Sequence, residues 1–220
     1  MNAHDVAQYL QENPDFFERH AELFASLRVP SPHGGSAVSL AERQVGGLRD
    51  RLRASDARLA ELVRNARENE IISDNMLLWL RGLLIERDAQ RLPDTLVKTL
   101  ASGFTVPDVA LRLWGVEDAP AEAMASGWAQ PVPDDVRSFA NSLMAPYCGL
   151  NSGFAVAGWL SEHVRSMAMI PLRVGIAPQA FGLLVLGSPD AERFASSLGT
   201  GFLARIGELA SASLSRLLPR

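Results

Sequence analysis

The stretch that decides the fold is "RSMAMIPLRVGIAPQAFGLLVLGS", residues 165–188. Residues 165–174 and 180–188 are apolar runs of strand length, and "GIAPQ" between them carries the Gly and Pro of a turn. Strands joined by so short a connection pair antiparallel, because a parallel pair needs a crossover of a dozen residues or more. The stretch therefore predicts a β-hairpin within an antiparallel sheet.

The end of the second strand, "GSPDAERF" (residues 187–194), raises a functional question, because a Gly-Ser turn after a strand can cradle a phosphate. A P-loop needs a lysine after its glycines, and the only lysine of the chain is Lys98. "GTGFLA" (residues 199–204) fits a dinucleotide-binding pattern but follows no predicted strand and lies in no βαβ unit. We therefore interpret the Gly-Ser turn as a strand end that Asp190 and Arg193 help to close, and "GTGFLA" as the start of the last helix.

The sequence around the hairpin predicts further helices and strands by its periodicity and capping residues. In chain order these are a helix at 92–104, a strand at 108–116, a second strand at 126–132, a helix at 133–145, a loop or short strand at 146–153 and a closing helix at 198–218. Since a hairpin makes the sheet antiparallel and helices flank it, the predicted fold class is α+β rather than a doubly wound parallel sheet. We assign residues 75–220 to this domain.

A long helix is predicted before this domain, at residues 40–90, and no Pro or Gly interrupts it between residues 48 and 81. Its apolar residues alternate at spacings of three and four, which is the pattern of a coiled-coil seam. The a and d positions of this seam hold Val45, Leu48, Leu52, Ser55, Leu59, Leu62, Ala66, Asn69, Ser73 and Met76. The narrow seam favours a homodimer through residues 45–76. The alternative is an amphipathic helix packed on its own domain.

The N-terminal segment, residues 1–39, is predicted to form two short helices joined at Asn13, with a loop at residues 29–39. Asn13 would cap the second helix and Pro14 would take its first position. Three phenylalanines lie close together in this segment: Phe16, Phe17 and Phe24. Their rings form a natural surface for a separate protein partner, unless they pack against the long helix.

Composition excludes several classes of protein. Of the 220 residues, 47% are hydrophobic and 21% are charged, so the chain can bury a core. The net charge of −4 argues against nucleic-acid binding, which usually needs a basic face. The N-terminus lacks the apolar region of a signal peptide, no apolar stretch is long enough for a membrane span, and the single cysteine cannot form an internal disulfide. We expect a soluble, cytoplasmic protein.

Catalytic and metal-binding motifs are missing from the sequence. The four histidines are scattered, with no H-x-x-x-H spacing and no second cysteine to complete a metal site. Cys148 and His163 could in principle pair as nucleophile and base. A lone cysteine between Tyr147 and Gly149 is more often a packed small residue, so we expect no catalytic role for either and no enzyme activity.

The hairpin, with the "RF" and closing helix that follow it, resembles the end of a GAF domain, where a strand ending in Pro-Leu precedes a strand ending in Gly-Ser. The whole chain is similar to an uncharacterised bacterial family of GAF-like proteins, domain-of-unknown-function family 484. The matching stretches are "VAQYLQENPDFFERHAELF", "AVSLAERQVGGLRDR", "PYCG" and "FGLLVLGSPDAERFASSLGTGFL". The resemblance implies a GAF-like antiparallel sheet flanked by helices. GAF relatives bind cyclic nucleotides, tetrapyrroles, small metabolites or nothing, so it names no cofactor.

In a GAF-like fold a ligand would lie between the sheet and the loops that cross it. The candidate ligand-binding residues at this place are Arg112, Trp114, Tyr147, Cys148, Asn151, Trp159, Ser166 and Met169. Aromatic rings beside an arginine suit a small apolar or anionic ligand. The alternative for each ring is plain core packing. A tetrapyrrole attached through Cys148 is a further alternative, weakened because no histidine lies beside it in sequence.

Two functions remain open. The first is a non-enzymatic, dimeric regulatory or sensory module that signals through the long helix to a separate protein and can bind a small molecule. The alternative is a structural or adaptor protein, with an empty GAF-like scaffold and partner-binding N-terminal helices. A small molecule that co-purifies with the protein would discriminate between the two.

Overall fold

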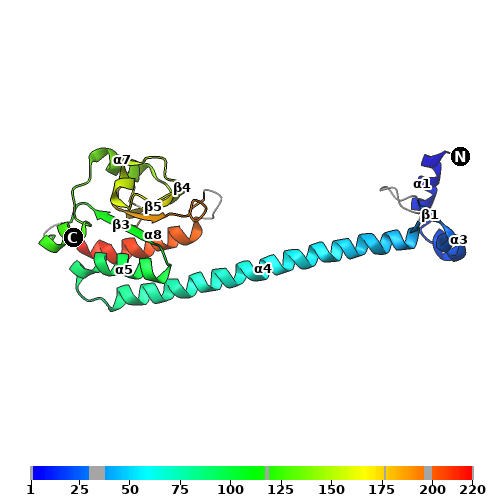
Figure 1. The fold of residues 1–220 in the computed structure, drawn as a ribbon, viewed down its shortest axis with the longest axis horizontal. Coiled ribbons are helices and arrows are strands. Elements are labelled where there is room, and N and C mark those ends of the chain that lie inside the picture. Colours follow the sequence, from blue (N-terminus) through cyan, green and yellow to red (C-terminus); the bar gives the residue numbers. More distant parts are fainter. Residues whose placement is uncertain (1, 30–37, 117–118, 176, 196–199, 220) are drawn as a thin grey trace. The chain divides into compact units, whose positions relative to one another are not determined.

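The computed structural model in Figure 1 describes residues 2–29, 38–116, 119–175, 177–195 and 200–219. The chain divides into two compact units, Met1–Glu68 and Asn69–Arg220. The boundary lies within the longest helix, α4 (Leu40–Ile85), so each unit contains part of this helix.

The first unit begins with three short helices and a small antiparallel ladder: α1 (Ala3–Glu12), α2 (Phe16–Arg19), α3 (Ala21–Ser26), β1 (Arg28–Val29) and β2 (Val38–Ser39). A capping box begins α1, because the side chain of Asn2 accepts the N–H of Asp5 and the carboxylate of Asp5 accepts the N–H of Asn2. The predicted first helix is confirmed.

The prediction of one second helix capped by Asn13 is wrong. Asn13 ends α1, because its backbone N–H and its side-chain amide both donate to the carbonyl oxygen of Tyr9, at 3.0 and 2.9 Å. Asp15 precedes α2, and His20 separates α2 from α3.

The phenylalanines predicted as a partner surface are partly packed on one another. The ring of Phe16 lies 5.9 Å from the ring of Tyr9 and 5.4 Å from that of Phe17, both edge to face. The side chain of Phe24 lies outside the described part of the chain, as do residues 30–37 of the predicted loop.

The predicted long helix is confirmed as α4, which ends at Ile85. Its seam residues Leu48, Leu52 and Leu59 are 60 to 63% exposed. The seam does not continue to Met76, because this side chain is buried in the core of the second unit together with Trp79. The apolar face of α4 therefore divides into an exposed part and a part that packs on its own domain.

The second unit holds, besides the end of α4, the elements η1 (Ala89–Arg91), α5 (Leu92–Gly103), β3 (Asp108–Leu113), α6 (Ala121–Ser126), α7 (Asp134–Ser142), β4 (Tyr147–Leu150), η2 (Ala155–Trp159), β5 (Ser166–Arg173), β6 (Ala180–Ser188), α8 (Gly201–Leu214) and η3 (Ser215–Leu217). Its sheet has the order β3-β6-β5-β4, and every neighbouring pair is antiparallel. The predicted hairpin is β5–β6, and the predicted α+β fold class is confirmed.

The strand predicted at 126–132 is wrong. The segment instead ends the unpredicted helix α6, because Gly127 adopts the left-handed conformation (φ +92°) that terminates helices. Trp128 follows with a buried side chain, and its carbonyl oxygen accepts the N–H of Leu113 at 2.8 Å. The apolar residues of this stretch serve a packed turn, which sequence alternation does not distinguish from a short strand.

Both faces of the sheet are covered. Figure 1 shows α5 and α8 on the α4 side and α7 on the opposite side. On the α4 side the strands contribute Ile170 and Leu184 to one core cluster, and on the α7 side they contribute Met169 and Leu183 to a second cluster. All nine residues of the central strand β6 are buried. We call the two sides the helix face and the loop face.

The Gly-Ser turn is a strand end, as predicted. Ser188 Oγ accepts the N–H of Asp190 at 3.1 Å, and the hydroxyl of Ser166 donates to the carbonyl oxygen of Asp190 at 2.5 Å. The N–H of Arg193 also donates to this carbonyl, at 3.4 Å. The side chain of Arg193 leaves the turn and donates to the carbonyl oxygen of Phe104 at the end of α5, at 2.7 Å.

Candidate functional site

The strand register brings part of the predicted site together on the loop face. Arg112 is opposite Leu183, and Tyr147 is opposite Met169, which in turn is opposite Val185. Residues directly opposite each other share a face, and Leu183, Met169 and Val185 all belong to the loop-face core. Trp114 and Trp159 pack against the same core. Five of the eight candidate residues therefore share one side of the sheet.

Arg112 and Trp159 form the most distinctive pair on this face. The guanidinium carbon of Arg112 lies 5.1 Å from the centroid of the Trp159 ring, a cation–π arrangement. The guanidinium donates to the carbonyl oxygen of Leu111 at 3.0 Å and to Oε1 of Gln130 at 3.1 Å. Burial lowers the pKa of Arg112 from its ordinary value. Neutral groups therefore hold the cation. The guanidinium also lies close to Gly127, where an added Cβ atom would approach Nη1 of Arg112 to 2.8 Å.

The remaining aromatic side chains of the loop face are engaged with the protein itself. The indole N–H of Trp114 donates to the carbonyl oxygen of Ala180 at 2.6 Å. The ring of Tyr147 meets Phe154 edge to face at 5.3 Å, and Phe154 lies 5.8 Å from Phe139. A cavity of about 90 Å³ remains beside Phe139 and Phe154. These rings therefore fill the space around Tyr147, whereas a cavity of about 280 Å³ remains beside Trp114 and Val132.

Cys148 and Ser166 lie away from this group. Cys148 is opposite Ala168, so it belongs to the helix-face core, where burial raises the pKa of its thiol. Ser166 is fully buried and occupied with the Gly-Ser turn. His163 is exposed, while Cys148 is buried, which offers no support for a nucleophile–base pair.

Asn151 has a structural role in the loop after β4. Its side-chain amide donates to the carbonyl oxygen of Val164 at 3.1 Å, and its Oδ1 accepts the N–H of Gly153 at 3.3 Å. These bonds hold the β4–η2 connection against the segment that leads into β5.

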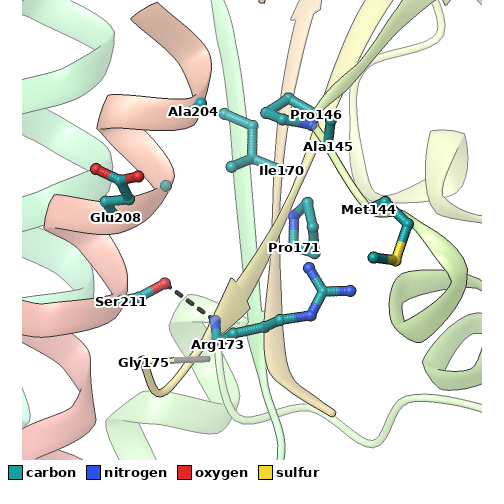
Figure 2. Close-up of a pocket in the computed structure, with 11 residues that line it drawn as sticks. Met144, Ala145, Pro146, Ile170, Pro171, Arg173, Gly175, Ala204, Glu208 and Ser211 are labelled. Atoms are coloured by element: carbon teal, nitrogen blue, oxygen red, sulfur yellow. Dashed lines mark hydrogen bonds between the residues drawn. The ribbon is translucent and has the colours of Figure 1, made fainter. Parts of the chain in front are cut away.

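The sequence did not predict a groove of about 250 Å³ beside the edge of β5, which Figure 2 shows. Ile170, Pro171 and Arg173 of β5 form one wall, and Glu208 and Ser211 of α8 form the other. Ser211 Oγ accepts the N–H of Arg173 at 3.1 Å, the dashed line in Figure 2.

Arg173 is committed to the end of α7. Its Nη2 donates to the carbonyl oxygens of Ala140, Asn141 and Leu143 at 3.1, 3.1 and 2.8 Å, and its Nε donates to that of Pro178 at 3.2 Å. A cation on the last carbonyls of a helix is the favourable arrangement for the helix dipole. The donors of this side chain are therefore used to stabilise the fold.

A second cavity that the sequence did not predict lies on the helix face. It has a volume of about 210 Å³ and combines Ile72 of α4 and Leu100 of α5 with Phe194, Phe202 and Leu203 around α8. Among the described residues that line it, the charged one is Arg193, the same side chain that reaches Phe104. These residues are far apart in sequence, and no local sequence pattern brings them together.

Within the described residues, no three His, Cys, Asp or Glu side chains gather in a way that could hold a metal ion. Among the helices of the described ranges, none has both the length and the apolar character that crossing a membrane requires.

Comparison with known proteins identifies the family. The family described as "Protein of unknown function, DUF484" matches residues 1–219. The chain belongs to the DUF484 family. The resemblance seen in the sequence is thereby confirmed. Among curated proteins, this DUF484 chain is 25% identical over 221 residues to the Uncharacterized protein YigA of Escherichia coli (strain K12), covering 98% of this chain and 92% of YigA.

Solved structures similar to the DUF484 chain include a GAF domain, as the sequence resemblance implied. The GAF domain from Acinetobacter phosphoenolpyruvate-protein phosphotransferase has a TM-score of 0.49 and 13% identity, covering 65% of this chain and 92% of that chain. Free methionine-R-sulfoxide reductase from Neisseria meningitidis, solved in complex with its substrate, has a TM-score of 0.47 and 13% identity, covering 66% of this chain and 88% of that chain. Similarity of this degree says nothing about ligands or activity.

Proposed function

We propose that this DUF484 protein is a non-enzymatic regulatory module that self-associates through α4 and acts on a separate protein in the cytoplasm. The observation that supports this most is that α4 is exposed around Leu52 and Leu59 but buried near its C-terminal end. Near its C-terminal end, Trp79 and Leu83 are 2 and 1% exposed in the helix-face core, and the indole N–H of Trp79 points to the carbonyl oxygen of Leu96 at 3.4 Å. A helix anchored in this way can carry a change in the sheet domain along its length.

The exposed apolar side chains of α4 support self-association. Besides the seam at Leu52 and Leu59, the sheet-domain end of the helix exposes Ile71, Leu78 and Ile85 by 61 to 65%. These three recur every seven residues at the heptad position opposite the seam, so they form a second exposed apolar row along the helix. A single chain rarely leaves so many large aliphatic side chains in water. A second copy of α4 would cover the seam at Leu52 and Leu59.

The N-terminal helices are the proposed contact for the separate partner. Four of their apolar side chains are 38 to 51% exposed: Val6, Tyr9, Leu23 and Leu27. Of these, Tyr9 packs edge to face on Phe16, which in turn packs on Phe17.

The loop face also supports a second candidate function. Because Tyr147, Phe154 and Phe139 pack on one another and leave a cavity of about 90 Å³ beside Phe139 and Phe154, that part of the face suits an adaptor with an empty scaffold. Arg112 over Trp159 favours a sensor, since a half-buried cation with only neutral partners can receive an anion.

Native mass spectrometry of protein freshly purified from its own host tests the proposal. We expect the mass of two chains, together with a guest that denaturation releases. A guest lost in both Arg112→Ala and Trp159→Ala would place it on the loop face. Two chains without a guest would favour the adaptor, and a single chain at micromolar concentration would refute self-association.

A further inference from the structure

We propose that the helix-face cavity between α4, α5, β6 and α8 binds a small carboxylate with an apolar tail, such as a medium-chain alkanoate. The cavity of about 210 Å³ is walled by aliphatic and aromatic side chains, among them Ile72, Leu100, Phe202 and Leu203. Leu100 and Leu186 at its base are 0 and 2% exposed. Such a lining takes an apolar group out of water without burying any unsatisfied polar atom.

Arg193 supplies the polar end of the proposed site. Within the described part of the chain, its Nη2 donates to the carbonyl oxygen of Phe104 at 2.7 Å, and its guanidinium carbon lies 6.0 Å from the centroid of the Phe194 ring. The ion pairs found among the described residues are Arg19–Asp15, Arg53–Asp50 and Arg137–Asp134, so no carboxylate neutralises Arg193 there. A half-buried guanidinium beside an apolar cavity matches a carboxylate with a hydrocarbon tail.

The size of the cavity sets the size of the ligand. Pockets for drug-sized molecules usually measure at least about 300 Å³, so about 210 Å³ suits a shorter molecule. The single cation and the absence of further charged lining residues argue against nucleotides, whose phosphates and sugar need several polar partners.

The position of the cavity connects it to α4. Ile72 lines the cavity, while Ile71, the preceding residue, is 61% exposed. A ligand that fills the cavity would press on α4 between its exposed seam and the part that Met76 and Trp79 anchor in the helix-face core. This link to self-association rests on the proposed function, whereas binding itself does not.

Isothermal titration calorimetry on the full chain tests the site, with octanoate as the probe and octanamide as its uncharged counterpart. We expect octanoate to bind about tenfold more tightly than octanamide, because a charge-assisted pair is lost with the amide. Arg193→Gln should abolish this preference, and Arg165→Gln, which changes an exposed arginine outside the cavity, should keep it. Leu203→Phe and, from a different wall, Ile72→Phe should fill the cavity and weaken octanoate binding by about tenfold or more.

Circular dichroism and thermal melts establish that each variant is folded before its titration is interpreted. Equal affinity for octanoate and octanamide would overturn the role of Arg193. Octanoate binding that survives both Leu203→Phe and Ile72→Phe, or no octanoate binding at millimolar concentration, would overturn the site. Arg193-dependent binding to a chain that sediments as a monomer would support the site and refute the proposed self-association.

Discussion

Gly207 of α8 lies directly against Ile170 of β5, where a Cβ atom at position 207 would meet Cγ2 of Ile170 at 2.7 Å. Ile170 is 1% exposed, and its Cγ2 is attached to the branched Cβ, so it cannot swing aside. The absence of a side chain at Gly207 therefore allows α8 to approach the sheet.

We predict that Gly207→Ala destabilises the sheet domain by about 1–3 kcal/mol, as overpacking does, despite the better helix propensity of alanine. Urea unfolding followed by circular dichroism measures the loss. Gly47→Ala is the matched control, because Gly47 is also helical but a Cβ atom added there would have no neighbour within 4 Å. Equal or greater stability of Gly207→Ala would show that α8 can shift away from β5.

Arg173 is predicted to hold α7 on the hairpin. Arg173→Met removes the donor to three carbonyls at the end of α7 and should lower the free energy of unfolding by about 2 kcal/mol, the range for bonds to a charged group. Arg173→Lys should recover only part of this, because one ammonium cannot reach all these oxygens. Chemical denaturation measures both variants, and an Arg173→Met chain as stable as the parent would contradict the prediction.

Cys148 is predicted to make stability depend on pH at the alkaline end. Burial raises the pKa of its thiol in the folded chain above its ordinary value of 9.0, so folding favours the neutral form. This contribution is fully present below the unfolded pKa and is lost as the pH rises through the folded pKa. Unfolding at several pH values above 9.0 should show a steeper loss for the parent chain than for Cys148→Ala. Identical slopes would show that the thiolate is accommodated.

The same burial should slow chemical modification of the thiol. Cys148 is 8% exposed, and the thiolate is the reactive form. We expect a thiol-specific disulfide reagent to react slowly with the folded chain at neutral pH and rapidly after unfolding in urea. Comparable rates in both states would indicate that the sheet opens at β4.

Self-association is predicted to depend on the exposed seam of α4. Leu52→Asp combined with Leu59→Asp should give monomers in sedimentation at tens of micromolar, because four like charges would face one another in the paired helices. Ala57→Asp combined with Arg64→Asp is the control, since both positions lie opposite the seam in the heptad. A parent chain that already sediments as a monomer, or a seam variant that still dimerises, would rule out this interface.

The sequence was sufficient to predict the elements whose type is indicated by their own residues. The hairpin β5–β6 has two apolar runs and a Gly-Pro connection between them, and α4 has an unbroken helical period from residue 48 to 81. For Gly127 and Asn13, by contrast, the local sequence was not sufficient to predict the element. Glycine and asparagine both occur at the ends of helices and in turns. The backbone hydrogen bonds around Gly127 and Asn13 decide which element each residue begins or ends.

The face of the sheet on which each site residue lies cannot be predicted from a single segment of the sequence. Because β6 is buried on both faces, its run of apolar residues has no period of two, and the sequence cannot say which side chains face the loops. Cross-strand register settles this: it places Arg112 and Tyr147 on the loop face and Cys148 on the helix face. The cavity that joins Ile72 to Arg193 arises only when helices distant in sequence pack on one sheet, because its shape is set by what several elements leave unfilled.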